Sequence, residues 1–163
     1  METVAIDDVE IRVNPLEVHS VRRPVSRALG TTDFAMNYFE LEPGESFSGG
    51  LHTHHDQEEL FYIQEGTATF EVGREREQVP VDAGEVVRFA PGEFQTGRNE
   101  SDSRVVGLAL GAPKASHDFA ELESIVPCRE CGEETAHGLA LTDDDGAFQF
   151  TCNECGNEFE MGT

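Results

Sequence analysis

The stretch that decides the fold is GGLHTHHDQEELFYIQEG, residues 49–66. It places three histidines and three acidic residues ahead of an apolar run that closes at a glycine. Successive side chains of a β-strand point to opposite faces, so His52 and His54 are expected to share one face and His55 to take the other. A hairpin turn would then bring Glu59, on the return strand, close to both imidazoles. Two histidines and one carboxylate with open coordination positions are typical of a site for Fe(II) or a similar divalent ion. The other reading is a polar turn between two strands.

Short segments rich in Phe, Val, Tyr and Thr continue on both sides of this stretch, separated by Gly or Pro turns. Many short strands at such spacing favour an all-β sandwich or barrel. We predict strands over residues 33–41, 46–54, 59–64, 67–73, 76–80, 84–90, 94–98 and 104–110. Six aromatic side chains are expected inside, as plain core or as the lining of a pocket: Tyr38, Phe47, Phe61, Phe70, Phe89 and Phe94.

The run from His52 to Gly66 resembles the first motif of the cupins. In that motif H-x-H is followed by three or four residues, a glutamate, six residues and a glycine. This sequence has His52-x-His54, four residues, Glu59, six residues and Gly66, while Ser46 replaces the glycine that leads into the family's motif. The resemblance implies a cupin-type jelly-roll β-barrel, with a metal ion held by the two histidines and the glutamate.

The second cupin motif has a counterpart that begins at Gly84, in which Gly92 and Asn99 fit the family's pattern. Ala90 stands where the family has a proline, and Gln95 stands where it has a histidine, its fourth metal-binding residue. A glutamine carbonyl is neutral and a weaker ligand than imidazole, so either Gln95 ligates through its carbonyl oxygen or water takes that position. The resemblance implies a divalent metal in the barrel, with Fe, Mn, Ni and Zn as the candidates.

The resemblance covers roughly residues 34–110 and implies a small-molecule role. Cupin substrates include sugars, organic acids and phenolic compounds, so the family does not select one. One hypothesis is a metal-dependent enzyme that applies Lewis-acid or dioxygen chemistry to a small oxygen-bearing molecule, with dioxygenase, isomerase and decarboxylase activities all left open. The alternative is a non-catalytic small-molecule-binding or sensor module. Cupins commonly dimerise by strand exchange or sheet packing, so a homodimer is expected, with the N-terminal arm as a candidate for that contact.

Two matched cysteine pairs lie near the end of the chain, Cys128-Arg-Glu-Cys131-Gly and Cys152-Asn-Glu-Cys155-Gly. Two intervening residues allow a tight turn that aims both sulfurs at one ion, and the glycine after each pair permits a positive φ. Four thiolates at this spacing predict a tetrahedral structural zinc site, in preference to a redox dithiol or two disulfides.

This part of the chain resembles a zinc ribbon, with HGLALT and AFQFT as strands joined by a hairpin turn at Asp143-Asp144-Asp145-Gly146. Zinc ribbons often contact nucleic acid or proteins. This one has Arg129 as its only basic residue and nine acidic residues from position 127 onward, so nucleic acid is disfavoured. The zinc is expected to replace a core that the segment is too small to build, with contact to a partner protein as the alternative role.

The sequence thus divides into four parts: an N-terminal arm over residues 1–30, a cupin β-barrel over 31–112, a linker over 113–125 and a zinc-ribbon-like module over 126–163. In the linker we predict a short helix from His117 to Ile125, with Ser116 as its N-cap.

The remaining histidines and Glu58, a further acidic residue of the first motif, are not expected to bind metal. His19, His117 and His137 have no partner at ligand spacing and are expected to be surface or packing residues. His55 and Glu58 are expected to be solvated turn residues.

The chain of 163 residues has a formal net charge of -22, with 33 acidic and 11 basic residues, and Lys114 is its only lysine. Acid enrichment with loss of lysine is typical of a halophilic surface, on which molar salt screens self-repulsion; an ordinary solvated acidic surface is the other interpretation. Phosphate backbones and anionic membranes are poor partners for either surface. The opening residues METVAIDDVE lack the basic start and apolar stretch of a signal peptide, so a soluble cytoplasmic protein is expected.

Overall fold

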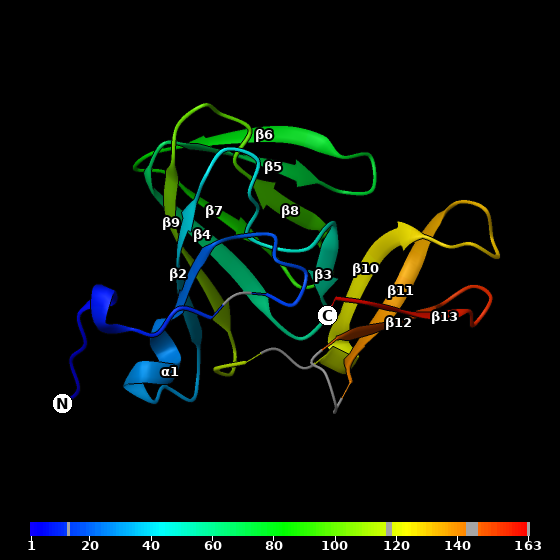
Figure 1. Cartoon of the computed structure of the whole chain (residues 1–163), viewed down its shortest axis with the longest axis horizontal. Helices are drawn as coiled ribbons and strands as arrows, with labels where there is room; N and C mark the ends of the chain where they lie inside the picture. Colours follow the sequence, from blue (N-terminus) through cyan, green and yellow to red (C-terminus); the bar gives the residue numbers. More distant parts are fainter. Residues whose placement is uncertain (13, 117–118, 143–146, 163) are drawn as a thin grey trace.

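The computed structural model describes residues 1–12, 14–116, 119–142 and 147–162. These residues form a nearly all-β structure in which a barrel occupies one side and the strands β10 to β13 project from the other (Figure 1). The barrel strands are β1 (Val21–Pro24), β2 (Ala35–Leu41), β3 (His52–His54), β4 (Glu58–Glu65), β5 (Thr67–Val72), β6 (Glu77–Asp82), β7 (Val86–Phe89), β8 (Gln95–Arg98) and β9 (Val105–Ala112). The C-terminal strands are β10 (Leu122–Pro127), β11 (Glu134–Leu141), β12 (Phe148–Cys152) and β13 (Glu158–Met161).

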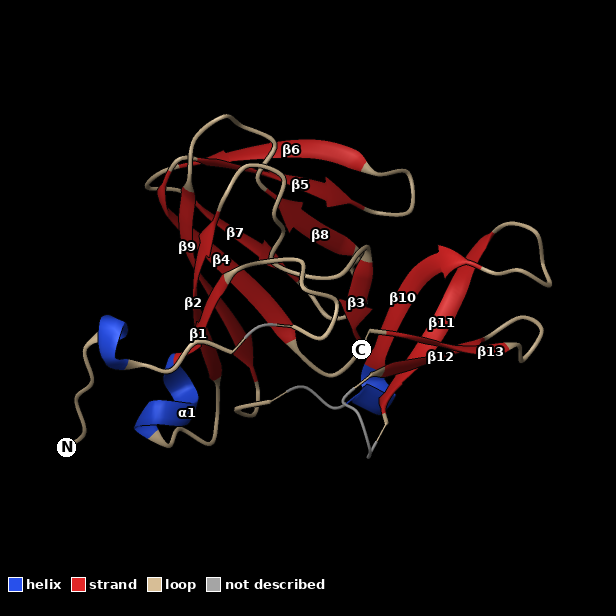
Figure 2. Ribbon diagram, in the orientation of Figure 1, coloured by secondary structure: helices blue, strands red, loops and turns tan. Residues whose placement is uncertain are grey.

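Helical structure in the described ranges is short, as the ribbon coloured by element shows (Figure 2). It consists of the helix α1 (Val25–Leu29) and the 3-10 turns η1 (Ile6–Asp8) and η2 (Phe119–Glu121). In these ranges no helix is long and apolar enough to cross a membrane.

Two antiparallel sheets build the molecule. The five-stranded sheet has the order β1-β2-β9-β4-β7, and the eight-stranded sheet has the order β13-β12-β11-β10-β3-β8-β5-β6. Gly66, the last residue of the first motif, joins β4 of one sheet to β5 of the other with a φ of +78°. A Cβ there would lie 2.6 Å from the carbonyl oxygen of Arg104, so only glycine fits this tight passage between the sheets.

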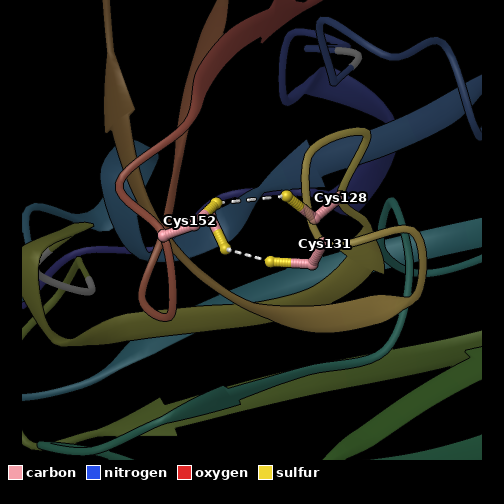
Figure 3. Close-up of side chains that lie close together, drawn as sticks. Cys128, Cys131 and Cys152 are labelled. Carbon is pink, nitrogen blue, oxygen red and sulfur yellow. Dashed lines mark hydrogen bonds between the residues drawn. The ribbon is translucent and has the colours of Figure 1, made fainter.

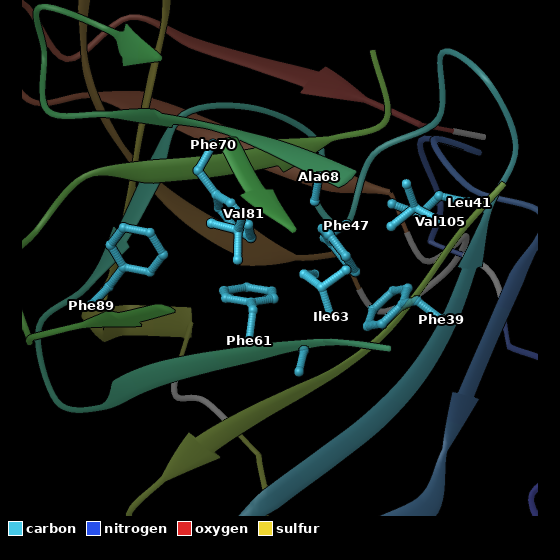
Figure 4. Close-up of a cluster of buried hydrophobic side chains, with 11 residues drawn as sticks. Phe39, Leu41, Phe47, Phe61, Ile63, Ala68, Phe70, Val81, Phe89 and Val105 are labelled. Atoms are coloured by element: carbon cyan, nitrogen blue, oxygen red, sulfur yellow. The ribbon is translucent and has the colours of Figure 1, made fainter. Parts of the chain in front are cut away.

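The core of the barrel lies between the two sheets and is rich in phenylalanine (Figure 4). Four of the six predicted aromatic residues lie in it, and the rings of Phe61 and Phe70 are only 5.0 Å apart. Tyr38 and Phe94 are half-buried and lie outside that core. The core residues are Phe39, Leu41, Phe47, Phe61, Ile63, Ala68, Phe70, Val81, Phe89, Val105 and Ala109.

Each of the eight predicted barrel segments overlaps a strand, but the one predicted over 46–54 is confined to His52–His54. The preceding residues bend because serine side chains bind the local backbone: the Ser46 hydroxyl donates to the carbonyl of Ser48 at 2.7 Å. Two consecutive glycines, Gly49 and Gly50, then lead into the strand. The ligand-bearing strand is therefore only three residues long.

The predicted helix from His117 to Ile125 is wrong in its described part. Phe119–Glu121 make a single 3-10 turn, and Leu122–Pro127 form strand β10. This segment is drawn into a strand because it pairs on both sides, with β3 of the barrel and with β11 of the C-terminal strands. Such pairing satisfies backbone groups that a helix of this length would satisfy poorly. Residues 117–118 and the hairpin turn predicted at 143–146 lie outside the described residues.

Candidate metal centres

The barrel brings together three of the predicted metal ligands. Strand β3 supplies His52 and His54, strand β4 supplies Glu59, and both histidines are buried. The His52 Nε2 atom lies 3.8 Å from one carboxylate oxygen of Glu59, and His54 Nε2 lies 3.6 Å from the other. Donors about 2.1 Å from an ion stand about 3.0–3.4 Å apart in octahedral or tetrahedral geometry, so these three could hold a metal ion after a small contraction.

A backbone contact orients the first histidine of this cluster. The Nδ1 atom of His52 lies 2.9 Å from the carbonyl oxygen of Gly50 and can act only as the donor there. Neutral imidazole carries one proton, so this bond leaves the lone pair on Nε2, the atom that faces Glu59. Such a second partner is the usual means by which a protein orients a metal-binding histidine.

Gln95, the predicted fourth ligand, lies in the same cluster. It is 2% exposed and stands directly opposite His52 on strand β8. Its amide nitrogen donates to Glu59 at 2.6 Å and lies 3.3 Å from His52 Nε2, while its Oε1 atom is buried with no hydrogen-bond partner among the described residues. Rotation of the amide by half a turn would aim that oxygen into the cluster. The residue is therefore placed to offer a carbonyl ligand.

Burial raises the pKa of Glu59, and its neighbours oppose that effect. The electrostatic interaction with His52 and the hydrogen bond from Gln95 both lower the pKa of this carboxyl group. A cation between these groups would further favour the ionised carboxylate, since opposite charge stabilises it. The three donor groups could therefore hold a divalent ion.

A small, closely packed depression lies beside the cluster. Its lining includes three residues that sequence reasoning missed, Thr53, Gln57 and Glu93. Gln57 is buried and donates to the backbone carbonyl of Pro113, and the hydroxyl of Thr53 is buried with no hydrogen-bond partner in the part of the chain that the structure describes. In the sequence, only their positions in or near the two cupin-like motifs could have indicated that these residues line the site. The full lining is Thr53, His54, Gln57, Glu59, Phe89, Ala90, Glu93 and Gln95.

The four cysteines form a second cluster, with the sulfurs of the two pairs facing each other (Figure 3). The Sγ atoms of Cys128 and Cys155 are 3.6 Å apart, and those of Cys131 and Cys152 are 3.9 Å apart. Zn–S bonds of about 2.3 Å in a tetrahedron separate the sulfurs by about 3.8 Å. All four cysteines are free thiols, so the geometry matches a zinc-ribbon-like site and no disulfide is present among them.

The two cysteine pairs sit in matching turns. The N–H of Gly132 donates to the carbonyl of Cys128 at 2.9 Å, and Gly156 donates to Cys152 at the same distance. The φ angles of these glycines are +77° and +74°, in the region that favours glycine. The repeated Cys-x-x-Cys-Gly signature therefore encodes one local structure twice.

Thr135 is a residue of this cluster that sequence reasoning missed. Its hydroxyl lies 3.2 Å from the Sγ atom of Cys152, and this hydrogen bond lowers the pKa of Cys152 to about 6. Hydrogen bonding with neighbouring thiols, first of all Cys155, instead raises the pKa of Cys131. A bound zinc ion would stabilise all four thiolates at once.

The described histidines that were not expected to bind metal lie outside both clusters. His137 is fully buried beside Phe159, with ring centroids 5.4 Å apart, and His19 is buried beside Phe39 at 5.1 Å, so both are packing residues as predicted. His117 lies outside the described residues.

His55 and Glu58 point to ion-pair partners rather than to the metal cluster. His55 is exposed and its Nε2 atom lies 3.1 Å from a carboxylate oxygen of Glu123. Glu58 is exposed and accepts a hydrogen bond from Arg88 at 2.5 Å. Both side chains therefore lie at the surface, as expected.

The comparison with known families identifies the barrel. The cupin domain family matches residues 37–111. This part of the chain is a cupin domain. The match includes both histidines, Glu59 and Gln95, and it ends before strand β10. No match was found among curated proteins.

Solved structures of cupins resemble the chain at low sequence identity. A sugar phosphate isomerase of the cupin superfamily from Silicibacter pomeroyi is 19% identical, with a TM-score of 0.60, and the match covers 99% of this chain and 93% of that one. A predicted oxalate decarboxylase from Thermotoga maritima is 21% identical, with a TM-score of 0.57, covering 69% and 99%. The polyketide cyclase RemF from Streptomyces resistomycificus is 20% identical, with a TM-score of 0.57, covering 71% and 82%. At these identities the likeness shows the fold alone.

Proposed function

We propose that the cupin barrel binds one divalent metal ion through His52, His54 and Glu59, with the carbonyl oxygen of Gln95 as a fourth ligand. The ion would hold a small oxygen-bearing molecule at the adjoining depression, where side chains would have to move apart to admit it. The observation that supports this most directly is the convergence of buried donor atoms from strands β3, β4 and β8 on one point. When bound, such an ion supplies Lewis-acid polarisation of a substrate oxygen, and with iron it also supplies dioxygen chemistry.

The chain's own residues have separate tasks in this proposal. The contact with Gly50 holds His52 in one tautomer, and the carboxylate of Glu59 offsets part of the charge of the ion. Phe89 forms an apolar part of the lining, which limits the access of water. Glu93 is the second carboxylate of the lining and is exposed, so it is the candidate to exchange a proton with a substrate hydroxyl group.

For the C-terminal strands we propose one structural zinc ion bound by Cys128, Cys131, Cys152 and Cys155. The sulfur separations of 3.6 and 3.9 Å support it, because they are close to those of a tetrahedral Zn–S₄ site. Strands β12 and β13 form only a small sheet edge, so metal binding would supply stability that their packing does not.

Metal analysis of protein purified without added metal tests both sites. We expect two equivalents per chain in the wild type, one barrel ion of Fe, Mn, Ni or Zn and one zinc. Glu59→Ala should lose the barrel equivalent only, whereas Glu58→Ala, which removes the neighbouring exposed carboxylate, should keep both. Cys155→Ser should lose the zinc. A wild type with one equivalent, unchanged in Glu59→Ala, would contradict the barrel assignment.

A second candidate function is a non-catalytic sensor, and the pairing of β3 with β10 favours it, because ligand binding at β3 would reach the C-terminal strands directly. Enzyme and sensor differ in turnover. Metal-loaded protein can be incubated with sugars, organic acids and phenols while NMR follows both line broadening and product. Product that disappears in Glu59→Ala supports the enzyme, and broadening without product supports the sensor.

A further inference from the structure

Strand β3, which carries both histidines, pairs mainly with β10, a strand of the C-terminal part of the chain. Strand β3 pairs with β8 at one position, His52 opposite Gln95. It pairs with β10 at three positions, with Leu122, Glu123 and Ser124 opposite His54, Thr53 and His52. Without β10, this three-residue strand would have an open edge.

One row of cross-strand neighbours connects the two candidate metal centres. Gln95 lies opposite His52, His52 opposite Ser124, Ser124 opposite His137, and His137 opposite Cys152. All five side chains are buried, with exposed fractions between 0% and 8%. Neighbouring strands lie about 4.8 Å apart, so four steps span about 20 Å. The row begins at a proposed barrel ligand and ends at a proposed zinc ligand.

The same junction has a small apolar core. Leu51, which precedes β3, packs in one cluster with Ile125 of β10 and Ala136 of β11. Phe94, which precedes Gln95, packs against this cluster. The residues next to two barrel ligands therefore contact the C-terminal strands directly.

Two arginines of the β5–β6 turn add a polar clasp across the junction. Arg74 lies over the ring of Phe94 and pairs with Glu123 at 3.5 Å. Arg76 contacts Glu71 of the barrel at 2.8 Å and Glu134 of β11 at 2.9 Å. We refer to these pairs as the arginine clasp, because each arginine joins the barrel to a different C-terminal strand.

We propose that zinc in the four-cysteine module sets the metal affinity of the barrel, so that the two centres are coupled through β10. The inference rests on the proposed function of the barrel. Zinc orders the turn that follows β10, β10 holds β3, and β3 fixes the spacing of His52 and His54. If β10 loosens, the two imidazoles are held less well toward Glu59, and the ion binds more weakly. Coupling between binding sites is reciprocal, so the barrel ion should also slow the loss of zinc.

Mn²⁺ is a suitable probe, because it prefers imidazole and carboxylate ligands to thiolates. Titration of the full chain with Mn²⁺, with EPR detection of the free ion, measures the barrel site alone. We expect the Mn²⁺ dissociation constant to rise about tenfold when Cys128→Ser and Cys131→Ser remove the zinc, within the usual range of coupling. The reciprocal measurement is the rate of zinc transfer to a chromogenic chelator, which saturating Mn²⁺ should reduce in the wild type.

A clasp variant tests the coupling without touching a cysteine. Glu123→Gln with Glu134→Gln keeps the zinc and alters the contacts of these carboxylates with Arg74, Arg76 and His55. It should weaken Mn²⁺ binding about two- to fivefold, the scale of a few partly exposed ion pairs. Glu130→Gln with Glu160→Gln is the matched control. It removes the same two charges from exposed positions of the same module, and none of the ion pairs found in the described ranges involves either residue.

The outcomes separate this inference from the function on which it rests. Wild-type protein that binds Mn²⁺ with a dissociation constant unchanged in the folded cysteine variant refutes the coupling and leaves the barrel site standing. If the cysteine variant does not fold, the clasp variant decides, and equal affinity in clasp and control variants refutes the coupling. A wild type that binds neither Mn²⁺ nor another divalent ion in the barrel overturns the proposed function and this inference with it.

Discussion

At the scale of single residues, Gln95 shows how one substitution shapes a metal site. The family's pattern has a histidine at this position, and the glutamine offers a neutral oxygen in its place. Gln95→His should restore a third imidazole, and binding of Ni²⁺ or Zn²⁺ to the barrel should tighten roughly tenfold, since both ions favour imidazole. Gln95→Ala is the companion variant. It should weaken binding if the carbonyl ligates, whereas equal affinity in Gln95→Ala and wild type would show that water takes this position.

Glu59 illustrates a conflict between binding and stability. Its pKa in the folded protein lies above the ordinary 4.5, mainly because of burial. The folded metal-free protein therefore binds protons more tightly than the unfolded chain does, and its stability falls as the pH rises above that ordinary value.

Glu59→Gln should remove this penalty. We expect the metal-free variant to melt at a higher temperature than the metal-free wild type at neutral pH. The gap should narrow as the pH is lowered, because the wild-type carboxyl group then becomes protonated in the folded protein. Calorimetry in the presence of a chelator that spares the cysteine site makes the comparison, and a lower melting temperature for Glu59→Gln at pH 7 would refute the argument.

At the scale of elements, strand β8 carries Gln95 and also closes the core. A Cβ on Gly97 would lie 2.5 Å from Phe70 and 2.9 Å from Phe47, two rings of a close-packed cluster. Gly97→Ala should therefore destabilise the barrel by about 1–3 kcal/mol through overpacking. Gly50→Ala is the control, because a Cβ there meets no atom within 4 Å and its φ is not positive. Urea denaturation should separate the two variants, and equal midpoints would show that the core adjusts at no cost.

The barrel strands and the grouping of the candidate ligands in two clusters could be predicted from the sequence, because each depends on a short-range pattern. Alternating residues placed His52 and His54 on one face, and two Cys-x-x-Cys-Gly signatures specified two matching turns. Strand β10 could not be predicted in the same way. Residues 122–127 become a strand through pairing on both sides, with the neighbouring β11 and with β3, which lies far away in sequence. Thr135 was missed for a similar reason, since its contact with Cys152 exists only across a sheet.

At the scale of the whole molecule, the eight-stranded sheet makes barrel and C-terminal strands one structure rather than two joined by a linker. That arrangement gives a physical reason for the module to be present beside a small-molecule site. The expected homodimer and cytoplasmic location stay predictions, and sedimentation of the metal-loaded protein would test the first of them.

The net charge of -22 belongs to the whole surface and predicts how stability responds to salt. Two electrostatic effects oppose each other. Salt weakens the arginine clasp and other exposed pairs, each worth about 0–1 kcal/mol. Salt also screens the repulsion among 33 acidic residues that face only 11 lysines and arginines, and this effect sums over many pairs. The screening of repulsion should dominate, because most carboxylates cannot be paired with a lysine or arginine whose attraction salt would weaken.

We therefore expect the melting temperature to rise steadily between dilute buffer and 2 M KCl at constant pH. KCl is preferable to a sulfate salt, because sulfate also strengthens the burial of apolar groups and would raise the melting temperature of a neutral protein. The clasp variant Glu123→Gln with Glu134→Gln should show a smaller difference from wild type in 2 M KCl than in dilute buffer, since salt has already weakened those pairs. A melting temperature that does not change across the salt series would mean that the loss of local ion pairs offsets the screening of repulsion. The acidic composition would then describe an ordinary solvated surface rather than one suited to high salt.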